Sequence, residues 1–388
     1  MTEILRYCRS MTDSDRRATA SGKTIDSIIA EYEEAEKFGR RAVPNSAIAA
    51  FTPEVFQHIG YPHRIAHSQE LWRYHDVMQD GRLEQNLLLA GRSMDDELDL
   101  VGSAADAIIR FTETNFGFRS AGKDMLSRAV YQYSLLRESL NGLPRPWTVL
   151  ELGPGCGYLG VLLGLGGHSY IAIEASQAFW VYQSALLRFV FAGEYSDGLR
   201  SEEELRIRHV PWWKLCSEGF AFPKLTACTA NHMLAEMNAA ALVYLSRKLA
   251  VSQPVGFKII AEDLGLCRYN DEHETLRRIV KTGFSATETK SRVWVFESGS
   301  NSGEIRRLPK PRRTFRQRLK EAPIVGRAAV SVFKVVGSFS KDNSIDVTAR
   351  STNSITSIGA ETSSLLATRF ERLPAHRSAD ARFADGSW

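Results

Sequence analysis

Hydrophobic and polar positions follow three different patterns along the chain. Over residues 1–145 the apolar side chains recur at helical spacing, as in the stretches TIDSIIAEYEEAEKF and DMLSRAVYQYSLLRESLNGL, the second of which ends at Gly142 and Pro144. Little in this part alternates with the period of two that a half-buried strand shows. The pattern therefore predicts a mainly helical N-terminal region over residues 1–145.

Short apolar runs alternate with longer helical segments over residues 146–303. The runs expected to form buried strands are WTVLEL, SYIAIEA, KLTACTA, VGFKIIAED and RVWVFES. The segments with helical periodicity between them are YLGVLLGLG, QAFWVYQSALLRFVFAG, MLAEMNAAALVYLSRKLA and HETLRRIVKTG. This alternation predicts an α/β fold, with a Rossmann-like parallel sheet and helices on both faces. The last run, RVWVFES, is also compatible with an antiparallel edge strand.

The C-terminal part has a third character. Residues 304–340 are rich in Arg and Lys and contain few acids, whereas residues 341–388 are mainly small and polar. Within the basic segment, apolar residues share a face over 312–337, which is typical of a peripheral helix at the inner membrane surface. The same pattern is equally typical of a solvated linker or a helix that binds a partner. The composition of 341–388 is typical of a disordered tail.

Composition excludes several functional classes. The net charge of +4 over 388 residues is too small for a dedicated nucleic-acid-binding protein. The five cysteines form no CxxC pair, which favours a reducing, cytoplasmic setting without a disulfide framework or a zinc site. No run approaches the ~20 apolar residues that cross a bilayer, and no HExxH metal motif is present. We therefore expect a cytoplasmic protein without a bound metal.

The candidate chemistry begins at the stretch VLELGPGCGYLG, residues 149–160, which follows the first predicted strand. At the carboxyl edge of an α/β sheet, a glycine-rich turn lets the backbone approach a ligand and aims free N–H groups at it. Gly155, Gly157 and Gly160 fit the dinucleotide pattern GxGxxG, and Glu174 follows at about the 20-residue spacing of an acid that binds ribose hydroxyls. Alone, these residues favour an NAD(P) cofactor.

A second interpretation also accounts for Glu151, the acid inside the strand before the loop. Glu151, Gly153, Gly155 and Gly157 form E-x-G-x-G-x-G, which resembles motif I of the class I S-adenosylmethionine-dependent methyltransferases. The resemblance implies that the loop wraps the methionine part of S-adenosylmethionine (SAM) and that Glu174 binds both ribose hydroxyls. A buried strand acid is costly unless it is paired, and Glu151 has no role in the dinucleotide pattern. We therefore expect SAM as the cofactor.

Further motifs extend the resemblance. The order of motif I, the Pro-Trp-Trp of residues 211–213 and the stretch ANHMLAEM of residues 230–237 resembles the sugar O-methyltransferase family over roughly residues 120–300. This implies methyl transfer to a hydroxyl of a sugar or glycan acceptor, in bacterial surface-polysaccharide or glycolipid synthesis. Residues 146–303 are then the SAM-binding domain, and residues 1–145 are a lid or an acceptor-binding region.

Candidate catalytic residues follow the later strands. His232 comes directly after KLTACTAN, and a histidine suits a base that removes the proton of a sugar hydroxyl. Asn231 is placed to bind the acceptor or the cofactor, and Glu236, one helical turn further, to orient His232 or bind the sugar. Alternatively, Asn231 and His232 only cap the following helix. Asp263, after KIIAE, is another candidate base, substrate contact or metal ligand.

The roles of two tryptophans, and two functional classes other than a methyltransferase, stay open at this point. Trp212 and Trp213 either bind the substrate or cofactor by stacking or belong to the core. An NAD(P)-dependent oxidoreductase would bind a nicotinamide cofactor and would not respond to S-adenosylhomocysteine (SAH). A non-catalytic scaffold would bind cofactor or membrane without turnover.

Overall fold

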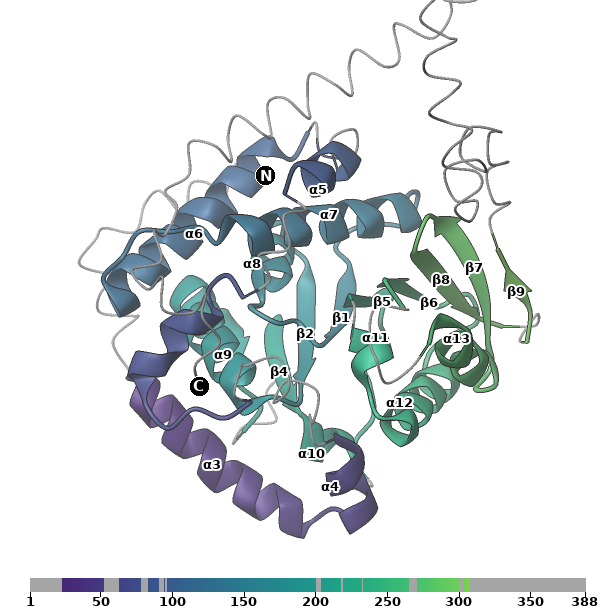
Figure 1. Ribbon diagram of the computed structural model, residues 1–388, viewed down its shortest axis with the longest axis horizontal. Helices are drawn as coiled ribbons and strands as arrows, with labels where there is room; N and C mark the ends of the chain where they lie inside the picture. The colour runs from purple at the N-terminus through teal and green to yellow at the C-terminus, as the bar shows by residue number, and fades with distance from the viewer. Residues whose placement is uncertain are drawn as a thin grey trace, which may run out of the picture.

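Figure 1 shows the computed structural model of the chain. The described residues are 23–51, 63–77, 83–90, 94, 96–199, 204–217, 219–231, 233–264, 271–299 and 303–307. Three features singled out by the sequence lie outside these residues: His232, the basic segment 312–337 and the tail 341–388.

A sheet in the order β3-β4-β2-β1-β5-β6-β8-β7-β9 forms the centre of the described chain. Its strands are β1 (Thr148–Leu152), β2 (Ser169–Glu174), β3 (Tyr195–Ser196), β4 (Ile207–Pro211), β5 (Ala227–Asn231), β6 (Lys258–Glu262), β7 (Phe284–Lys290), β8 (Val293–Ser298) and β9 (Ile305–Arg306). The strands from β3 through β6 pair in parallel, whereas β8 is antiparallel to both β6 and β7. Because β2 and β5 flank β1 on opposite sides, the strand order reverses at β1, which is where an α/β sheet binds its ligand.

The five strands expected from apolar runs are all present, and the Rossmann-like α/β fold is confirmed. The run RVWVFES became β8, which is antiparallel but lies inside the sheet between β6 and β7 rather than at its edge. Two longer strands were missed. The strand β4 carries Arg208, His209 and Pro211, and β7 buries only alternate residues at its start, so neither forms a continuous apolar run.

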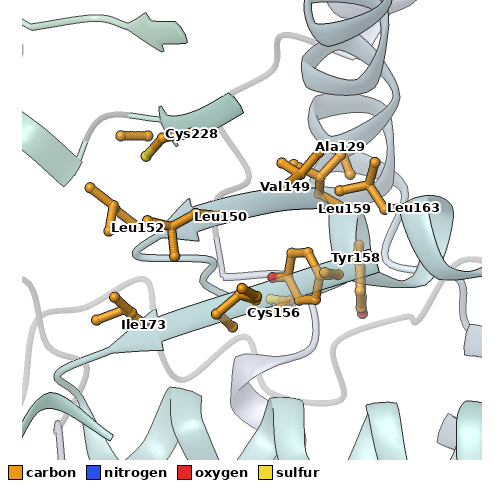
Figure 2. Packing of buried hydrophobic residues seen from close by; sticks show 14 of the residues in the cluster. Ala129, Val149, Leu150, Leu152, Cys156, Tyr158, Leu159, Leu163, Ile173 and Cys228 are labelled. Carbon is orange, nitrogen blue, oxygen red and sulfur yellow. The ribbon is translucent and has the colours of Figure 1, made fainter. Parts of the chain in front are cut away.

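Helices surround the sheet in two groups (Figure 1). In the first group, α7 (Lys123–Ser139), α8 (Tyr158–Leu165) and α9 (Gln177–Phe191) pack side by side, and in the second α12 (Ala239–Ser252) packs against α13 (Glu272–Val280). The helix α7 contacts β5 and β6. Figure 2 shows Ala129 of α7 beside Val149 of β1 and Leu159 of α8. The last helix of residues 1–145 is therefore part of the layer that covers the sheet.

The remaining helices continue the same core. They are α3 (Ile25–Arg41), α4 (Asn45–Phe51), η2 (Ser68–Tyr74), α5 (Leu83–Ala90), α6 (Leu98–Phe116), η4 (Ala192–Glu194), α10 (Trp212–Leu215) and α11 (Met233–Glu236). The N-terminal region is thus helical where it is described, as its periodicity predicted. Its buried residues, Ile28 among them, belong to the same hydrophobic cluster as Phe296 of β8. Within the described chain, no helix has both the length and the apolar character needed to cross a bilayer.

The segment MLAEMNAAALVYLSRKLA, expected to be one helix, forms two. The first, α11, ends at Glu236, and Asn238 then caps α12 by accepting a hydrogen bond from the Ala240 N–H at 2.8 Å. Asparagine is among the best N-cap residues because its side chain satisfies an otherwise unpaired N–H. The break leaves a single helical turn between β5 and α12, and this turn holds Glu236 near the carboxyl edge of the sheet.

Candidate active site at the carboxyl edge of the sheet

The loop between β1 and α8 is held in a conformation that favours glycine. Gly153, Gly155 and Gly157 have φ values of +64°, +57° and +75°, all in the left-handed region. A Cβ added to Gly153 would lie 2.4 Å from Cγ of Met233, and one added to Gly157 would lie 2.9 Å from Cγ of Gln183. Both backbone conformation and space therefore select glycine, and the loop is fixed between α9 and α11.

Three carboxyl groups gather beside this loop: Glu151, Glu174 and Glu236. Glu151 is 3% exposed and accepts the Tyr170 hydroxyl at 2.6 Å. The pKa of Glu151 is raised to about 8, chiefly by burial; the hydrogen bond from Tyr170 opposes this rise, and the nearby charge of Glu174 contributes to it. Each of these charges disfavours ionisation of its neighbours.

The other two acids show the same behaviour. Burial raises the pKa of Glu174 to about 7, even though its carboxylate accepts the Ser176 N–H at 2.8 Å, and the charge of Glu236 adds to this rise. Burial also raises the pKa of Glu236 to about 7. Acids that resist ionisation together would all ionise more readily beside a positive charge, so the cluster favours a cationic ligand.

A buried guanidinium faces this cluster from the N-terminal region. Arg128 of α7 is 7% exposed, and its charge lowers the pKa of Glu236 against the effect of burial. The same charge acts on the thiol of Cys156 in the glycine loop, whose pKa is raised chiefly by burial. Arg128 thus lies within electrostatic reach of both the loop and α11. No sequence motif indicated it, because Arg128 is one of two arginines in a helix that also carries Lys, Asp and Glu.

Asn231, at the end of β5, has a buried amide without a partner. Neither its Nδ2 nor its Oδ1 makes a hydrogen bond to any described residue. Leaving a buried polar group unpaired costs about 1–3 kcal/mol. The alternative that the Asn231 side chain caps the next helix is therefore wrong, because the amide accepts no N–H of α11. A ligand at the carboxyl edge would satisfy both atoms.

Trp212 and Trp213 lie in the core. Trp212 is 1% exposed and stacks on Phe51 of α4, with ring centroids 6.1 Å apart. Trp213 is 5% exposed and meets Tyr32 of α3 edge-on at 5.2 Å. This packing corresponds to the core alternative that the sequence left open, and it joins α3 and α4 to the end of β4.

Asp263 follows β6 with its side chain fully buried and ion-paired to Arg292. The carboxylate of Asp263 already has a cationic partner, so its charge is balanced within the protein rather than by a ligand. Among the described residues, no group of three or more His, Cys, Asp or Glu side chains is placed to hold a metal ion.

A segment of the N-terminal region lies against the loop and the start of α9. The thiol of Cys156 donates to the carbonyl of Tyr74 at 2.7 Å, and the N–H of Ala178 donates to the carbonyl of His63 at 3.1 Å. Residues 63–77 therefore contact both the glycine loop and the chain just after Glu174. Their possible use as a lid or acceptor-binding surface stays a prediction.

Comparisons with known proteins do not show a family for this chain. No protein-family model and no curated protein matches the chain. Among solved structures, "PigF with SAH" is 17% identical over 63% of this chain and 83% of that chain, with a TM-score of 0.31. The magnesium protoporphyrin IX methyltransferase ChlM from Synechocystis PCC 6803 with bound SAM is 14% identical over 53% of this chain and 100% of that chain (TM-score 0.33). A methyltransferase from Pyrococcus furiosus is 13% identical over 51% and 98% (TM-score 0.32). Because these sequence identities and TM-scores are low, we infer the function from the residues of the candidate site.

Proposed function

We propose that the chain is a SAM-dependent O-methyltransferase that acts on a sugar hydroxyl. The observation that carries this proposal is a group of three acids beside a left-handed glycine loop: Glu151 and Glu174, which are buried, and Glu236, which is half-buried. SAM carries a sulfonium and an ammonium group, and a cation is what such a cluster stabilises. Its adenosine also has two ribose hydroxyls that donate hydrogen bonds to a carboxylate.

The residues present fit this cofactor. Glu174 would accept both ribose hydroxyls, and the loop from Gly153 would hold the methionine part. Glu151 would face the positive charge, and the buried cation Arg128 would hold the carboxylate of the methionine part. The bound cofactor supplies an electrophilic methyl group on its sulfonium.

An NAD(P) cofactor fits these residues less well. Its pyrophosphate would lie at the glycine loop and the start of α8 with two negative charges. The charge of Glu174 already raises the pKa of Glu151 there, and the charge of Glu236 raises that of Glu174, so further negative charge would be opposed. Gly160, the third glycine of the dinucleotide pattern, packs on Tyr170. That packing suits either cofactor and does not favour NAD(P).

The acceptor side has groups suited to a hydroxyl. The pKa of Glu236, about 7, is close to the optimum for a general base at neutral pH. The unpaired amide of Asn231 both donates and accepts, as recognition of neighbouring sugar hydroxyls requires. In the transfer, the acceptor oxygen would bond to the methyl carbon as the bond from that carbon to the sulfonium sulfur breaks and SAH leaves, and the hydroxyl proton would pass to Glu236 or His232. We place the acceptor in a bacterial surface polysaccharide or glycolipid, as the resemblance of the motifs implies.

Cofactor identity is tested by thermal unfolding with SAM, SAH and NAD(H), each added to the full chain. We expect SAM and SAH to raise the Tm and NAD(H) to leave it unchanged, because a ligand that binds only the native state adds about 2.7 kcal/mol at 100 times its Kd. Stabilisation by NAD(H) alone would overturn the assignment. SAH formation with a set of nucleotide sugars and glycan fragments then tests the reaction. If SAM raises the Tm but no hydroxylated acceptor is methylated, the chain is a non-catalytic scaffold that binds SAM, and the proposed reaction is wrong.

The base is tested by two variants compared with Glu113→Gln, which changes an exposed acid on α6. We expect His232→Ala to keep SAM binding and to lose methyl transfer. We expect Glu236→Gln to lower kcat about 100-fold and to remove the ionisation near pH 7 from the pH–rate profile. Steady-state kinetics and the Kd for SAM provide both readouts. A variant that turns over at the rate of Glu113→Gln excludes that residue as the base.

A further inference from the structure

A buried chain of hydrogen bonds runs from β4 to the glycine loop through His209 and Gln183. His209 is 2% exposed and Gln183 is fully buried. The Nε2 of Gln183 donates to the carbonyl of Gly155 at 2.6 Å, and Oε1 of Gln183 lies 2.7 Å from Nε2 of His209. On its other side, Nδ1 of His209 lies 3.0 Å from the hydroxyl of Tyr195 and 3.2 Å from that of Ser184.

The carbonyl of Gly155, at one end of this chain of hydrogen bonds, determines where each proton lies. The carbonyl of Gly155 can only accept, so the Gln183 atom bonded to it is the amide nitrogen, and Oε1 must face His209. Because Oε1 can only accept, Nε2 of His209 carries the proton, and Nδ1 accepts from Tyr195 or Ser184. Burial lowers the pKa of His209 to about 3, and the opposed charges of Asp197 and Arg188 change this little, so the ring stays neutral.

The same amide also reaches the acid at the end of β2. A hydrogen bond from the Gln183 side chain lowers the pKa of Glu174 against the larger effect of burial. Since an ionised carboxylate only accepts, the Gln183 group that stabilises the charged form of Glu174 is its amide N–H, on the same nitrogen that donates to Gly155. One amide group thus holds both the glycine loop and the candidate ribose acid.

His209 decides which way this amide faces. If the amide turned over, Oε1 of Gln183 would lie against the carbonyl of Gly155 and the carboxylate of Glu174, and three acceptors would meet without a proton. The N–H of His209 stabilises the other orientation, because it is satisfied only by Oε1. Without that donor, the two orientations would differ less in free energy, and the loop and Glu174 would lose their common anchor.

We propose that His209 is a positioning residue for cofactor binding, which acts through Gln183 on Gly155 and Glu174 without touching the ligand. This inference rests on the proposed function, in which the loop and Glu174 bind SAM. His209 also packs beside Trp180 in the core, with ring centroids 5.5 Å apart, and the proposed role is additional to this packing.

The test compares two substitutions of His209 that differ in hydrogen bonding. His209→Gln can place an amide N–H where the imidazole Nε2–H lies, whereas His209→Leu fills the space without a donor. We expect the Kd for SAM and for SAH to rise about tenfold or more in His209→Leu and to stay within about threefold of wild type in His209→Gln, because tenfold corresponds to 1.4 kcal/mol. Calorimetric titration gives both constants, and urea unfolding of each apoprotein monitors the fold.

Two further readouts separate positioning from packing. Gln183→Met is expected to weaken binding as much as His209→Leu, and the double variant no more than Gln183→Met alone, since both act through one amide. The affinity for SAH should rise with pH as Glu174 ionises. The midpoint of this rise should lie at higher pH in His209→Leu, because Glu174 loses the hydrogen bond from Gln183 that lowers its pKa. Equal weakening by the Gln and Leu variants, or additive losses in the double variant, would overturn the proposal. A wild-type chain that binds neither SAM nor SAH would instead overturn the proposed function.

Discussion

Glu174→Gln is expected to weaken the binding of both SAM and SAH by about 30-fold or more while leaving the fold intact. The carboxylate would accept two ribose hydroxyls, and hydrogen bonds to a charged group contribute about 1.5–3 kcal/mol each. Glutamine has one acceptor oxygen and would present an N–H to the second hydroxyl. Calorimetric titration at pH 8 measures the effect, and Glu297→Gln, at an exposed carboxyl on β8, is the matched control.

The ionisation of Glu174 adds a pH dependence to the same measurement. Its pKa is about 7 in the free protein, so at pH 6 only about a tenth of the carboxyl groups are ionised. SAH affinity of the wild type should therefore fall about tenfold between pH 8 and pH 6, and Glu174→Gln should lack this fall. An unchanged Kd in Glu174→Gln, or the same loss in Glu297→Gln, would show that Glu174 does not bind the cofactor.

Glu151→Gln is expected to stabilise the apoprotein at high pH. The pKa of Glu151 is about 8 in the native state and 4.5 for the ordinary carboxyl, so the native state binds its proton more tightly than the unfolded state does. The stability that this proton contributes is complete below pH 4.5 and is lost as the pH rises through 8. Glutamine does not titrate and still accepts from Tyr170. Since one pKa unit corresponds to 1.36 kcal/mol, the variant should be more stable than the wild type by about 2 kcal/mol or more at pH 8.5.

The same substitution should separate the two cofactor forms. SAM carries the sulfonium charge that SAH lacks, so the Glu151→Gln variant should lose SAM affinity and keep most of its SAH affinity. Urea unfolding at pH 5 and pH 8.5, together with the two Kd values, tests both effects. A stability difference that is the same at both pH values would mean that Glu151 is already ionised in the apoprotein. Equal losses of SAM and SAH affinity would mean that it does not face the sulfonium.

Residues whose role depends on long-range packing could not be assigned from the sequence. Arg128 and Gln183 lie on helices that reach the glycine loop only after α7 and α9 have packed beside α8. The strand β4 was not predicted because it lacks a continuous apolar run. Its buried polar residue His209 is hydrogen-bonded to Gln183 of α9, a partner that only the tertiary structure supplies. Trp212 and Trp213 follow Pro211, which pairs with Glu174 across β4 and β2, yet α3 and α4 cover them.

The sequence by itself determined the parts of this protein that depend on local geometry. Left-handed turns require glycine, buried strands require apolar runs, and parallel strands end at one sheet edge, so spacing predicted the loop and Glu174. The resemblance to motif I of the methyltransferases added Glu151. Only the tertiary structure decided how these acids behave. Their pKa values depend on burial and on charges that arrive from distant segments, Glu236 among them. Local pattern thus located the candidate site, and the electrostatics of the folded chain are the ground on which we propose that it binds a cation.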